Sequence, residues 1–555
     1  MKKIVSHNKY SQYLSSYKNV SDIEVMETGD LKLNLHLDRG IYALLLAGLD
    51  DHKMPVVFLC NPEEGVTRKP HQLHLKKAEL IHLCLSVRDD ISVKNQSYKE
   101  ILDYTLIRVN RLLSLSDVEE RREIRKEFLY FWNKVSVNDK KVDLFINSSK
   151  TAKNLQIFKT KKSLIVYDSD ICVNSTFKEK WTKESTDVIY IPLINSSKIM
   201  PPFEEEKWDI ENLLELCNNC ISEDNIEVIE SINIHSKSIF LVFEMDIPEI
   251  LRATFLLKVG FGNNSVGNLF DRLSNIVKVE HFSSQRCDSG YLFNRIGVKN
   301  YCENGQVLLV GAGSLGSYIA SELPKIGVNK ITIIDDDEFS VENTMRHQLG
   351  AFSEGYNKAL AVKFQLELNY PEVVIDSKAE RFDEKKLSNY ALDDYDLIII
   401  TTGGTDFMLR LNKRFKEMNL SIPVFYTWIE ANGLGVHALP VDYSKKGCYQ
   451  CLYTNTTVNK AHYGNQSNVS KVIGTGCGGV FNPYGNLTLI KGSAMILELI
   501  QLYFSGQLGE ENNLLYSVRT SNSKLRKDFV INKRDFETSK DFYIDEGCEV
   551  CGIYL

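Results

Sequence analysis

The 555-residue sequence lacks the features that mark several classes of protein. It has no run of roughly 18 apolar residues, the length that a membrane-spanning helix needs. No apolar stretch follows the lysines of the N-terminal MKKIVSHNKYSQYL, so we expect no secretory signal peptide. Lys and Arg total 66 against 73 Asp and Glu, and the net charge of −7 gives no basic footprint for nucleic acid. We therefore expect a cytoplasmic protein that contacts neither membranes nor nucleic acid directly.

The sequence also shows no internal repeat or low-complexity segment, and its apolar share of 43% is enough for several hydrophobic cores. A chain of this length is expected to form about two to four domains. Its 12 cysteines, without a signal peptide, indicate a reducing compartment. There, paired cysteines bind metals or take part in chemistry more often than they form disulfides.

The chain divides into three regions by its pattern of strands and helices. Residues 1–150 place strands first, as in PVVFLC and ELIHLCLSV, and helices later, which predicts an α+β domain. Residues 151–285 mix short strands with one clear helix and predict an α/β linker domain. A Cys-x-x-Cys pair in that helix, Cys217 and Cys220, is expected to lie in the core. From 286 to 555, strands alternate with helices, which predicts a parallel, doubly wound Rossmann-like sheet.

A glycine-rich loop opens the third region. Gly311, Gly313 and Gly316 follow the apolar strand QVLLV in GxGxxG spacing and precede a helical pattern. Such glycines allow a tight turn and a close approach to phosphate, and the helix N-terminus supplies free N–H donors. Asp335 follows the next strand at the spacing of an acid that binds a ribose hydroxyl. This pattern predicts an adenine-nucleotide site, for which a dehydrogenase is the commonest function.

The loop after that second strand favours a different chemistry. It carries Asp335, Asp337, Asn343 and Arg346, and Lys358 follows on the next helix. Hydride transfer has little use for an Asn, an Arg and a Lys beside the phosphates. A triphosphate site does, because cations offset its developing negative charge and carboxylates hold magnesium. The alternative is a solvated polar loop without a ligand.

These residues resemble the adenylation domain of ubiquitin-activating enzymes and of their bacterial relatives ThiF and MoeB. The shared pattern is a glycine-rich loop, D-x-D, N-x-x-R and a helical Lys. The resemblance implies that Asp335 binds ribose, that Asp337 lies near magnesium and the phosphates, and that Asn343, Arg346 and Lys358 contact the phosphates, with Arg346 and Lys358 in catalytic roles. It also implies that the C-terminal carboxylate of a protein is adenylated with release of pyrophosphate.

The sequence departs from the family pattern at one position. Gly403 stands where the family has an Asp, and Asp406 is the nearest carboxylate that could replace it. This departure leaves the magnesium ligands open. Arg295, upstream of the domain, resembles an arginine that the family sends across a homodimer interface.

Two Cys-x-x-Cys pairs lie near the C-terminal end of the sequence. Cys448 and Cys451 form the first, and Cys548 and Cys551 form the second. Two such pairs can close a tetrahedral zinc site even when they lie far apart in sequence, and four protein ligands make that site structural. ThiF and MoeB look the same here. The alternative is four free thiols or a redox pair.

Cys477 belongs to neither pair. It lies in VIGTGCGGV, after a polar segment and before an apolar helical pattern at 485–504. A thiol on an exposed loop before a helix N-terminus can form a stabilised thiolate. In activating enzymes, a cysteine at the corresponding place takes the adenylated carrier as a thioester, so Cys477 is predicted to be that nucleophile. The alternative is a structural thiol in a glycine-rich loop.

The first region resembles a divergent bacterial ubiquitin-conjugating enzyme, with a strand, a proline-rich turn, Pro-His, a strand ending in a cysteine, and C-terminal helices. Cys84 is then the acceptor thiol, and His71 or His74 is the nearby polar group. The usual His-Pro-Asn is absent, so the oxyanion-stabilising group is unassigned. The alternative is that Cys84 is a core residue of its strand.

The whole chain resembles bacterial fusions of a conjugating domain, a linker and an activating domain from CBASS antiphage operons. That resemblance implies domains at 1–150, 151–285 and 286–555, the cofactors ATP, Mg and Zn, and a homodimer. It also implies a partner protein with a flexible C-terminus, of which a cGAS-like nucleotidyltransferase is the candidate. The alternatives are a ThiF/MoeB-like sulfur-carrier adenylyltransferase, an NAD-dependent dehydrogenase and a non-catalytic scaffold.

Overall fold

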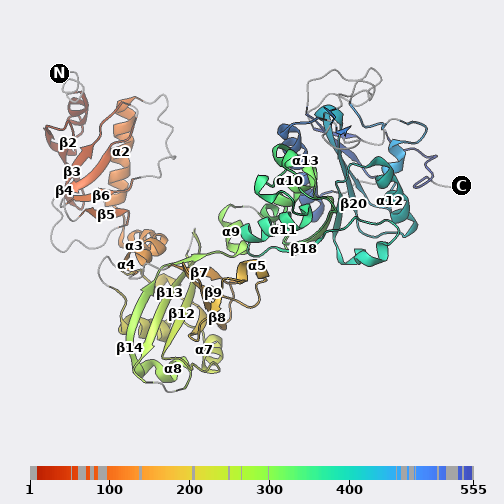
Figure 1. The fold of residues 1–555 in the computed structure, drawn as a ribbon. Coiled ribbons are helices and arrows are strands. Elements are labelled where there is room, and N and C mark those ends of the chain that lie inside the picture. Colours follow the sequence, from red (N-terminus) through yellow and green to blue (C-terminus); the bar gives the residue numbers. More distant parts are fainter. Residues whose placement is uncertain are drawn as a thin grey trace. The chain divides into compact units, whose positions relative to one another are not determined.

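The structure is a computed structural model that divides into two compact units (Figure 1). Unit 1 comprises residues 1–168 and 183–286, and unit 2 comprises 169–182 and 287–555. The described residues are 9–51, 53–60, 70–75, 80–85, 97–136, 141–202, 207–247, 250–263, 266–297, 299–457, 459–463, 472–473, 480–481, 483–508, 512–520, 536–539 and 543–552.

The first part of unit 1 is an antiparallel six-stranded sheet with the order β1-β2-β3-β4-β6-β5. Alternate leucines of β2 are fully buried, the pattern of a sheet with one face on the core. The helix α2 packs against that face, and its N-terminus is closed by a capping box of Ser97 and Glu100. The bounds are β1 Val20–Val25, β2 Leu31–Leu37, β3 Gly40–Ala47, β4 Val56–Cys60, β5 Gln72–Leu75, β6 Leu80–Leu83 and α2 Tyr98–Leu113.

The second part of unit 1 is a nine-stranded mixed sheet with the order β14-β13-β12-β11-β8-β9-β7-β15, beside which β10 pairs with β8. Its strands are β7 Val142–Phe145, β8 Lys153–Lys159, β9 Leu164–Tyr167, β10 Thr182–Lys183, β11 Asp187–Pro192, β12 Ser238–Ile247, β13 Ile250–Phe261, β14 Ile276–Phe282 and β15 Ser284–Arg286. The helices α6 (Ile210–Asn219) and α7 (Glu223–Glu230) belong to it. Cys217 and Cys220 are buried in this core, as predicted.

The helical part of the first region ends with two helices, α3 (Asp117–Lys126) and α4 (Phe128–Val135). Phe128 and Trp132 of α4 are fully buried in the core of the nine-stranded sheet, where both contact Phe255. The Trp132 indole donates a hydrogen bond to the Phe282 carbonyl at 3.1 Å. Helix α4 therefore packs with the second sheet, although it lies before residue 150.

Unit 2 contains an eight-stranded sheet with the order β18-β17-β16-β19-β20-β21-β24-β25. The first five strands are parallel, and β21, β24 and β25 extend them antiparallel. The bounds are β16 Gln306–Val310, β17 Lys330–Ile334, β18 Val374–Lys378, β19 Leu397–Ile400, β20 Val424–Ile429, β21 Gly435–Val441, β24 Leu515–Arg519 and β25 Phe536–Ser539. The Rossmann-like sheet predicted from the alternating pattern is present.

Two hydrophobic cores flank this sheet. The helices α10 (Ser314–Glu322), α11 (Lys358–Asn369) and α13 (Asn486–Phe504) pack into one core, and α12 (Thr405–Glu417) packs into the other. Helix α13 is long and apolar enough to cross a membrane by length and composition alone, although no membrane-spanning segment was predicted from the sequence. Leu489, Ile496 and Leu499 of α13 are fully buried in the first core, so packing explains their apolar character.

Candidate functional site

Two adjoining cavities open at the carboxyl ends of β16, β17 and β19, where the strand order reverses. Ligands of open α/β sheets bind at this position. The first cavity, of about 350 Å³, is lined by Asp335, Phe382 and Phe407, among others. The second, of about 320 Å³, is lined by Asn343, Arg346 and Lys358, among others. Gly313, Asp337, Thr401 and Thr402 line both.

Each glycine of the glycine-rich loop has its own structural role. Gly311 has φ +99°, and a Cβ there would lie 2.8 Å from the Thr401 hydroxyl oxygen. A Cβ on Gly316 would lie 2.0 Å from the Gly311 carbonyl oxygen, so only glycine lets α10 pack this close. A Cβ on Gly313 would meet nothing within 4 Å. Gly313 therefore leaves space in the cavities, whereas Gly311 and Gly316 hold the loop.

Asp335 connects the loop to the end of β17. Its carboxylate accepts the Ala312 N–H at 2.5 Å and the Asp337 N–H at 2.8 Å. Burial raises the pKa of Asp335, and these backbone hydrogen bonds oppose that rise. Each carboxylate oxygen has a second lone pair. Asp335 can therefore hold the loop and still accept a hydroxyl from a ligand in the first cavity.

Lys358 begins α11 and reaches the second cavity. Its ammonium lies 2.7 Å from the carboxylate of Asp337, and its backbone N–H donates to the Asp337 carbonyl at 2.9 Å. Asn357 caps the helix by accepting the Leu360 N–H, and its amide donates to the carbonyls of Asp335 and Asp337. The Lys358 side chain is 10% exposed and that of Asp337 is 68% exposed. The structure thus brings a buried cation to a carboxylate that is open to solvent.

Asn343 and Arg346 come from a short 3₁₀ helix, Val341–Arg346. The Asn343 carboxamide oxygen accepts the Ser340 N–H at 3.1 Å and closes the turn. The Arg346 guanidinium lies 3.4 Å from the Tyr484 hydroxyl and 5.9 Å from the centre of its ring. The structure therefore gathers Asp337, Asn343, Arg346 and Lys358 around one cavity, as the sequence predicted.

His347 supports the glycine-rich loop and was not singled out in the sequence. Its Nδ1 accepts the Leu349 N–H at 3.0 Å, so its Nε2 carries the proton and donates to the Ala312 carbonyl at 2.7 Å. Burial lowers the pKa of His347 to about 4, which keeps the ring neutral near pH 7. In the sequence, only its position directly after Arg346 could have pointed to His347. Its hydrogen bond to Ala312 spans 35 residues and leaves no local pattern.

The carboxylates that could hold a divalent cation are Asp335, Asp336 and Asp337, whose ligand atoms all lie within 4.8 Å of one another. Oxygen ligands of this kind suit Mg²⁺. Gly403 lies in the turn between β19 and α12 with φ +67°, a conformation that an Asp adopts only with strain. Asp406 is exposed in the first turn of α12 and lines neither cavity. Among the described residues, the acidic triplet includes the carboxylate that contacts Lys358.

The four C-terminal cysteines come together in unit 2. The sulfur atoms of Cys448 and Cys548 are 3.8 Å apart, and those of Cys451 and Cys551 are 3.3 Å apart. Zn–S bonds of about 2.3 Å in a tetrahedron place sulfur atoms roughly 3.8 Å apart. The Asn412 amide donates to the Cys448 sulfur at 3.4 Å. This donor set fits one zinc ion with no open coordination position.

The structure describes one of the two cysteines that are predicted to form thioesters. Cys477 lies outside the described residues. Cys84 is exposed directly after β6, and its N–H donates to the His71 carbonyl at 2.9 Å. The His71 ring lies 3.1 Å from Glu127 and 3.3 Å from Glu123. Partial burial and the charge of Glu127 raise the pKa of Cys84, so its thiol is mainly protonated near pH 7.

The structure therefore places the His71 backbone beside Cys84. The hydrogen bond with Glu127 raises the pKa of His71 and favours the imidazolium. The His74 side chain lies outside the described residues. Cys84 is not a core residue, because it is exposed and follows the last residue of the strand.

Residues 292–538 match the model of the ThiF family. The ATP-dependent ubiquitin transferase-like protein Cap2 of Enterobacter hormaechei is 37% identical over 138 residues, which cover 24% of this chain and 23% of Cap2. The adenylyltransferase and sulfurtransferase UBA4 of Lodderomyces elongisporus is 25% identical over 264 residues, covering 47% of this chain and 52% of UBA4. The crystal structure of E. coli MccB with AMPCPP and MccA aligns over 45% of this chain and 68% of MccB, at 17% identity and a TM-score of 0.34.

These matches are partial. The chain spans about a quarter of the length of Cap2 and about half that of UBA4. The family match begins just before β16 and ends at β25, so it contains both cavities and the first cysteine pair. The similarity to the ThiF family therefore covers residues 292–538, less than half of the chain.

Proposed function

We propose that this chain uses ATP to adenylate the C-terminal carboxylate of a partner protein. One observation carries the proposal. A glycine-rich loop and Asp335 line one cavity, and Asn343, Arg346 and Lys358 line the adjoining one. The first suits adenine and ribose, and the second suits phosphates and an incoming carboxylate.

The proposed chemistry follows from these positions. A carboxylate oxygen of the partner attacks the α-phosphorus of ATP, the bond from that phosphorus to the bridging oxygen breaks, and pyrophosphate leaves. Lys358 and Arg346 offset the negative charge that builds up on the phosphates. Magnesium, when bound, would further neutralise phosphate charge, and the acidic triplet would hold it. Displacement of Asp337 from Lys358 by the nucleotide would free both side chains for these roles.

The later steps are proposed to use two thiols. Cys477 attacks the acyl carbon of the adenylate, and AMP leaves as the thioester forms. The Cys84 sulfur then attacks that thioester, returns the Cys477 thiol and keeps the acyl group reactive toward an amine of the target. The raised pKa of Cys84 means that a base must take its proton before the sulfur attacks.

The partner and its setting are also proposals. Cap2 is an ATP-dependent ubiquitin transferase-like protein, and the similarity supports a protein partner with an accessible C-terminus. A cGAS-like nucleotidyltransferase, in antiphage defence in the cytoplasm, remains the candidate. The four-cysteine cluster is proposed to hold a structural zinc ion.

A homodimer is proposed from the resemblance at Arg295, which ends helix α9 (Ser289–Arg295). Unit 2 also exposes apolar side chains, with Phe352 96% exposed and Phe364 59% exposed. A second copy of the chain would bury them. Phe364→Glu should then shift the mass measured by light scattering from dimer to monomer.

A second function is sulfur-carrier adenylation, which the similarity to the adenylyltransferase and sulfurtransferase UBA4 favours. It uses the same adenylation step but leaves a carrier thiocarboxylate in place of a thioester on Cys84. Mass spectrometry of the recovered carrier separates the two, because a thiocarboxylate gains 16 mass units while Cys84 stays free.

The decisive experiment is ATP–pyrophosphate exchange followed by non-reducing electrophoresis. The chain is mixed with MgATP and a nucleotidyltransferase that ends in a flexible tail. We expect exchange in the wild type and in Cys477→Ala, and a thiol-sensitive adduct in the wild type alone. Cys172→Ala, which removes another exposed thiol, is the matched control and should keep the adduct. An adduct on Cys84 in Cys477→Ala would refute the order of the two thiols.

A further inference from the structure

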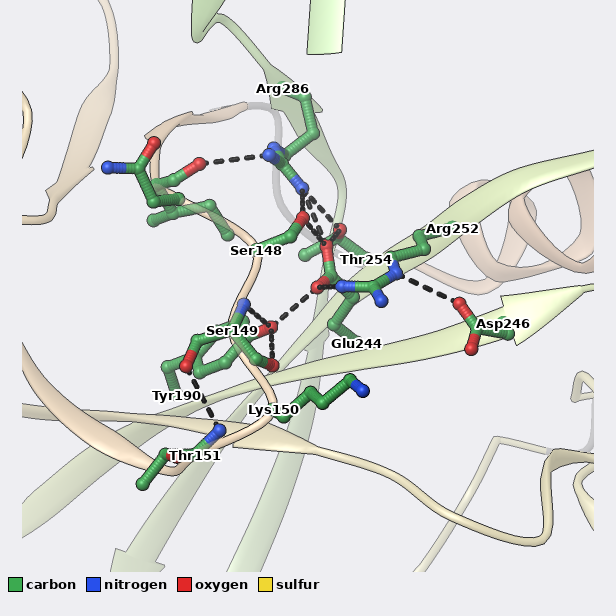
Figure 2. Close-up of polar contacts among 12 residues, drawn as sticks. Ser148, Ser149, Lys150, Thr151, Tyr190, Glu244, Asp246, Arg252, Thr254 and Arg286 are labelled. Carbon is green, nitrogen blue, oxygen red and sulfur yellow. Dashed lines mark hydrogen bonds and ion pairs between the residues drawn. The ribbon is translucent and has the colours of Figure 1, made fainter. Parts of the chain in front are cut away.

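The chain passes from unit 1 to unit 2 after Asp168 and again after Arg286. Both residues hydrogen-bond to the same short segment of unit 1, residues 146–148. Asp168, the last residue before the first crossing, accepts a hydrogen bond from Lys153 and one from the Asn147 N–H. Arg286, the last residue before the final crossing, donates to Glu244 at 2.7 Å and to the Ile146 carbonyl at 2.9 Å. Figure 2 shows the Arg286 guanidinium directed at the Glu244 carboxylate beside Ser148.

Residues 169–182 fold with unit 2, although residues of unit 1 precede and follow them. We call them the strap. The strap contains the short helix α5 (Ser175–Lys178), which contacts α11. Its central residue is Asn174, which is 2% exposed. The side-chain oxygen of Asn174 accepts the Phe177 N–H at 2.8 Å, which fixes the direction of the amide nitrogen.

The Asn174 amide nitrogen lies among the carbonyl groups that end helix α11. It is 2.9–3.1 Å from the carbonyl oxygens of four residues, Glu367, Tyr370, Pro371 and Val373. The backbone N–H of Asn174 also donates to the Pro371 carbonyl at 2.8 Å. The last carbonyls of a helix have no partner within the helix, and here the strap supplies the donors.

Two further contacts hold the same end of α11. The Thr176 hydroxyl donates to the Glu367 carboxylate at 2.6 Å, and Glu367 in turn accepts the Ile375 N–H of β18. After the final crossing, Ser289 donates to Glu372 through its N–H at 3.0 Å and its hydroxyl at 2.5 Å. The segments that follow the two crossings therefore both hydrogen-bond to the turn 370–373, between α11 and β18.

The other end of α11 is Lys358, in the second cavity. A helix of 12 residues is a rod of about 18 Å with fixed spacing between its ends. We propose that Asn174 is a positioning residue of the nucleotide site, which sets the axial position of α11 and so the reach of Lys358 toward the phosphates. On this proposal the 151–285 region contributes to ATP binding without touching the nucleotide. It rests on the proposed function only in assigning Lys358 to the phosphates.

The test compares three variants of the full chain. Asn174→Asp keeps the shape but replaces the donor with an acceptor that faces four carbonyl oxygens. Asn174→Ala removes the donor. Lys180→Ala changes an exposed strap residue and is the matched control. Thr176→Val, which removes only the bond to Glu367, serves if Asn174→Asp does not fold.

The probes are MgATP and AMP, titrated separately by calorimetry. Lys358 acts on phosphates that AMP lacks. We therefore expect ATP affinity to fall roughly tenfold in Asn174→Ala and further in Asn174→Asp, with AMP affinity changed less than about twofold. A role in general folding would weaken both nucleotides alike, and that result would overturn the proposal. Unchanged ATP affinity in both Asn174 variants would overturn it as well.

Hydrogen exchange of the free protein gives a readout without nucleotide. Loss of the Asn174 amide should speed exchange of the backbone amides at 366–375 and at 358–361, while Lys180→Ala leaves them unchanged. Faster exchange at 366–375 alone would refute the transmission along α11. If the wild type binds neither nucleotide, the proposed function fails, whereas unchanged exchange in Asn174→Asp refutes the role of the strap.

Discussion

The nucleotide cavities of unit 2 and the surroundings of Cys84 in unit 1 each include a histidine, and the two rings differ in charge. Burial lowers the pKa of His347 to about 4, so the ring is neutral beside the cations of the second cavity. The hydrogen bond with Glu127 raises the pKa of His71 and favours its protonated form. The first site leaves its positive charge on Arg346 and Lys358, while in the second the Cys84 thiol is partly buried within reach of the Glu127 charge.

The difference indicates which site is ready for its ligand. Cations around a cavity attract a triphosphate directly. Partial burial and the charge of Glu127 oppose the Cys84 thiolate, so this thiol is a poor nucleophile until it loses its proton. Unit 2 is thus organised for nucleotide binding by itself, whereas the chemistry of Cys84 depends on a change in its surroundings.

The largest effect on the comparison between the two sites is expected when the buried cation of the second cavity, Lys358, is removed. Lys358→Ala should lower ATP–pyrophosphate exchange by roughly 10²–10³-fold, the usual cost of losing one group that stabilises transition-state charge. Lys413→Ala removes an exposed lysine of α12 and should leave exchange unchanged. Equal exchange in the Lys358 variant would mean that the cavity does not use this cation.

The zinc proposal predicts the next largest effect. Cys448→Ser should reduce the zinc content from about one ion per chain and lower the melting temperature by roughly 5–10 °C, because metal binding contributes directly to folding. Atomic absorption and calorimetry measure the two quantities. Cys172→Ser is the control, since this thiol is exposed and lies outside the cluster. A full zinc content in Cys448→Ser would exclude this ligand set.

Two glycines of the same loop should respond in opposite ways. Gly316→Ala places a Cβ 2.0 Å from a carbonyl oxygen and should destabilise unit 2 by about 1–3 kcal/mol. Gly313→Ala meets no atom within 4 Å, so stability should hold while the methyl group occupies cavity space and weakens ATP binding. Denaturant melts and nucleotide titrations separate the effects. A destabilised Gly313→Ala with normal ATP binding would contradict the assignment.

Most of the side chains that the sequence singled out for a nucleotide site line the two cavities, because the signals that mark them are local. Gly311, Asp335 and Lys358 are each marked by spacing from a strand or helix, and the parallel sheet then brings those segments together. His347 was missed because its role depends on one hydrogen bond to a distant loop. The break at Glu127 has no local signal, because the segment ERREIRKEFLYFWNKV contains no proline or glycine, and it is seen only in the structure.

The strap illustrates a further limit. Asn174 is unremarkable in sequence, because an Asn before a short polar segment is a common helix cap. Its importance comes from carbonyl groups nearly 200 residues away. Contacts of this kind have no local pattern, and therefore only the folded chain reveals them.

The smallest effect tests the acidic side of the comparison. Glu127→Gln removes the charge that, with burial, raises the pKa of Cys84, and it removes the main cause of the raised pKa of His71. A lower thiol pKa means more thiolate at a given pH. Alkylation of Cys84 by iodoacetamide should therefore speed up about two- to fivefold at pH 8. Peptide mass spectrometry follows each thiol separately. The rate at Cys172 should stay constant, and an unchanged rate at Cys84 would show that Glu127 does not control this thiol.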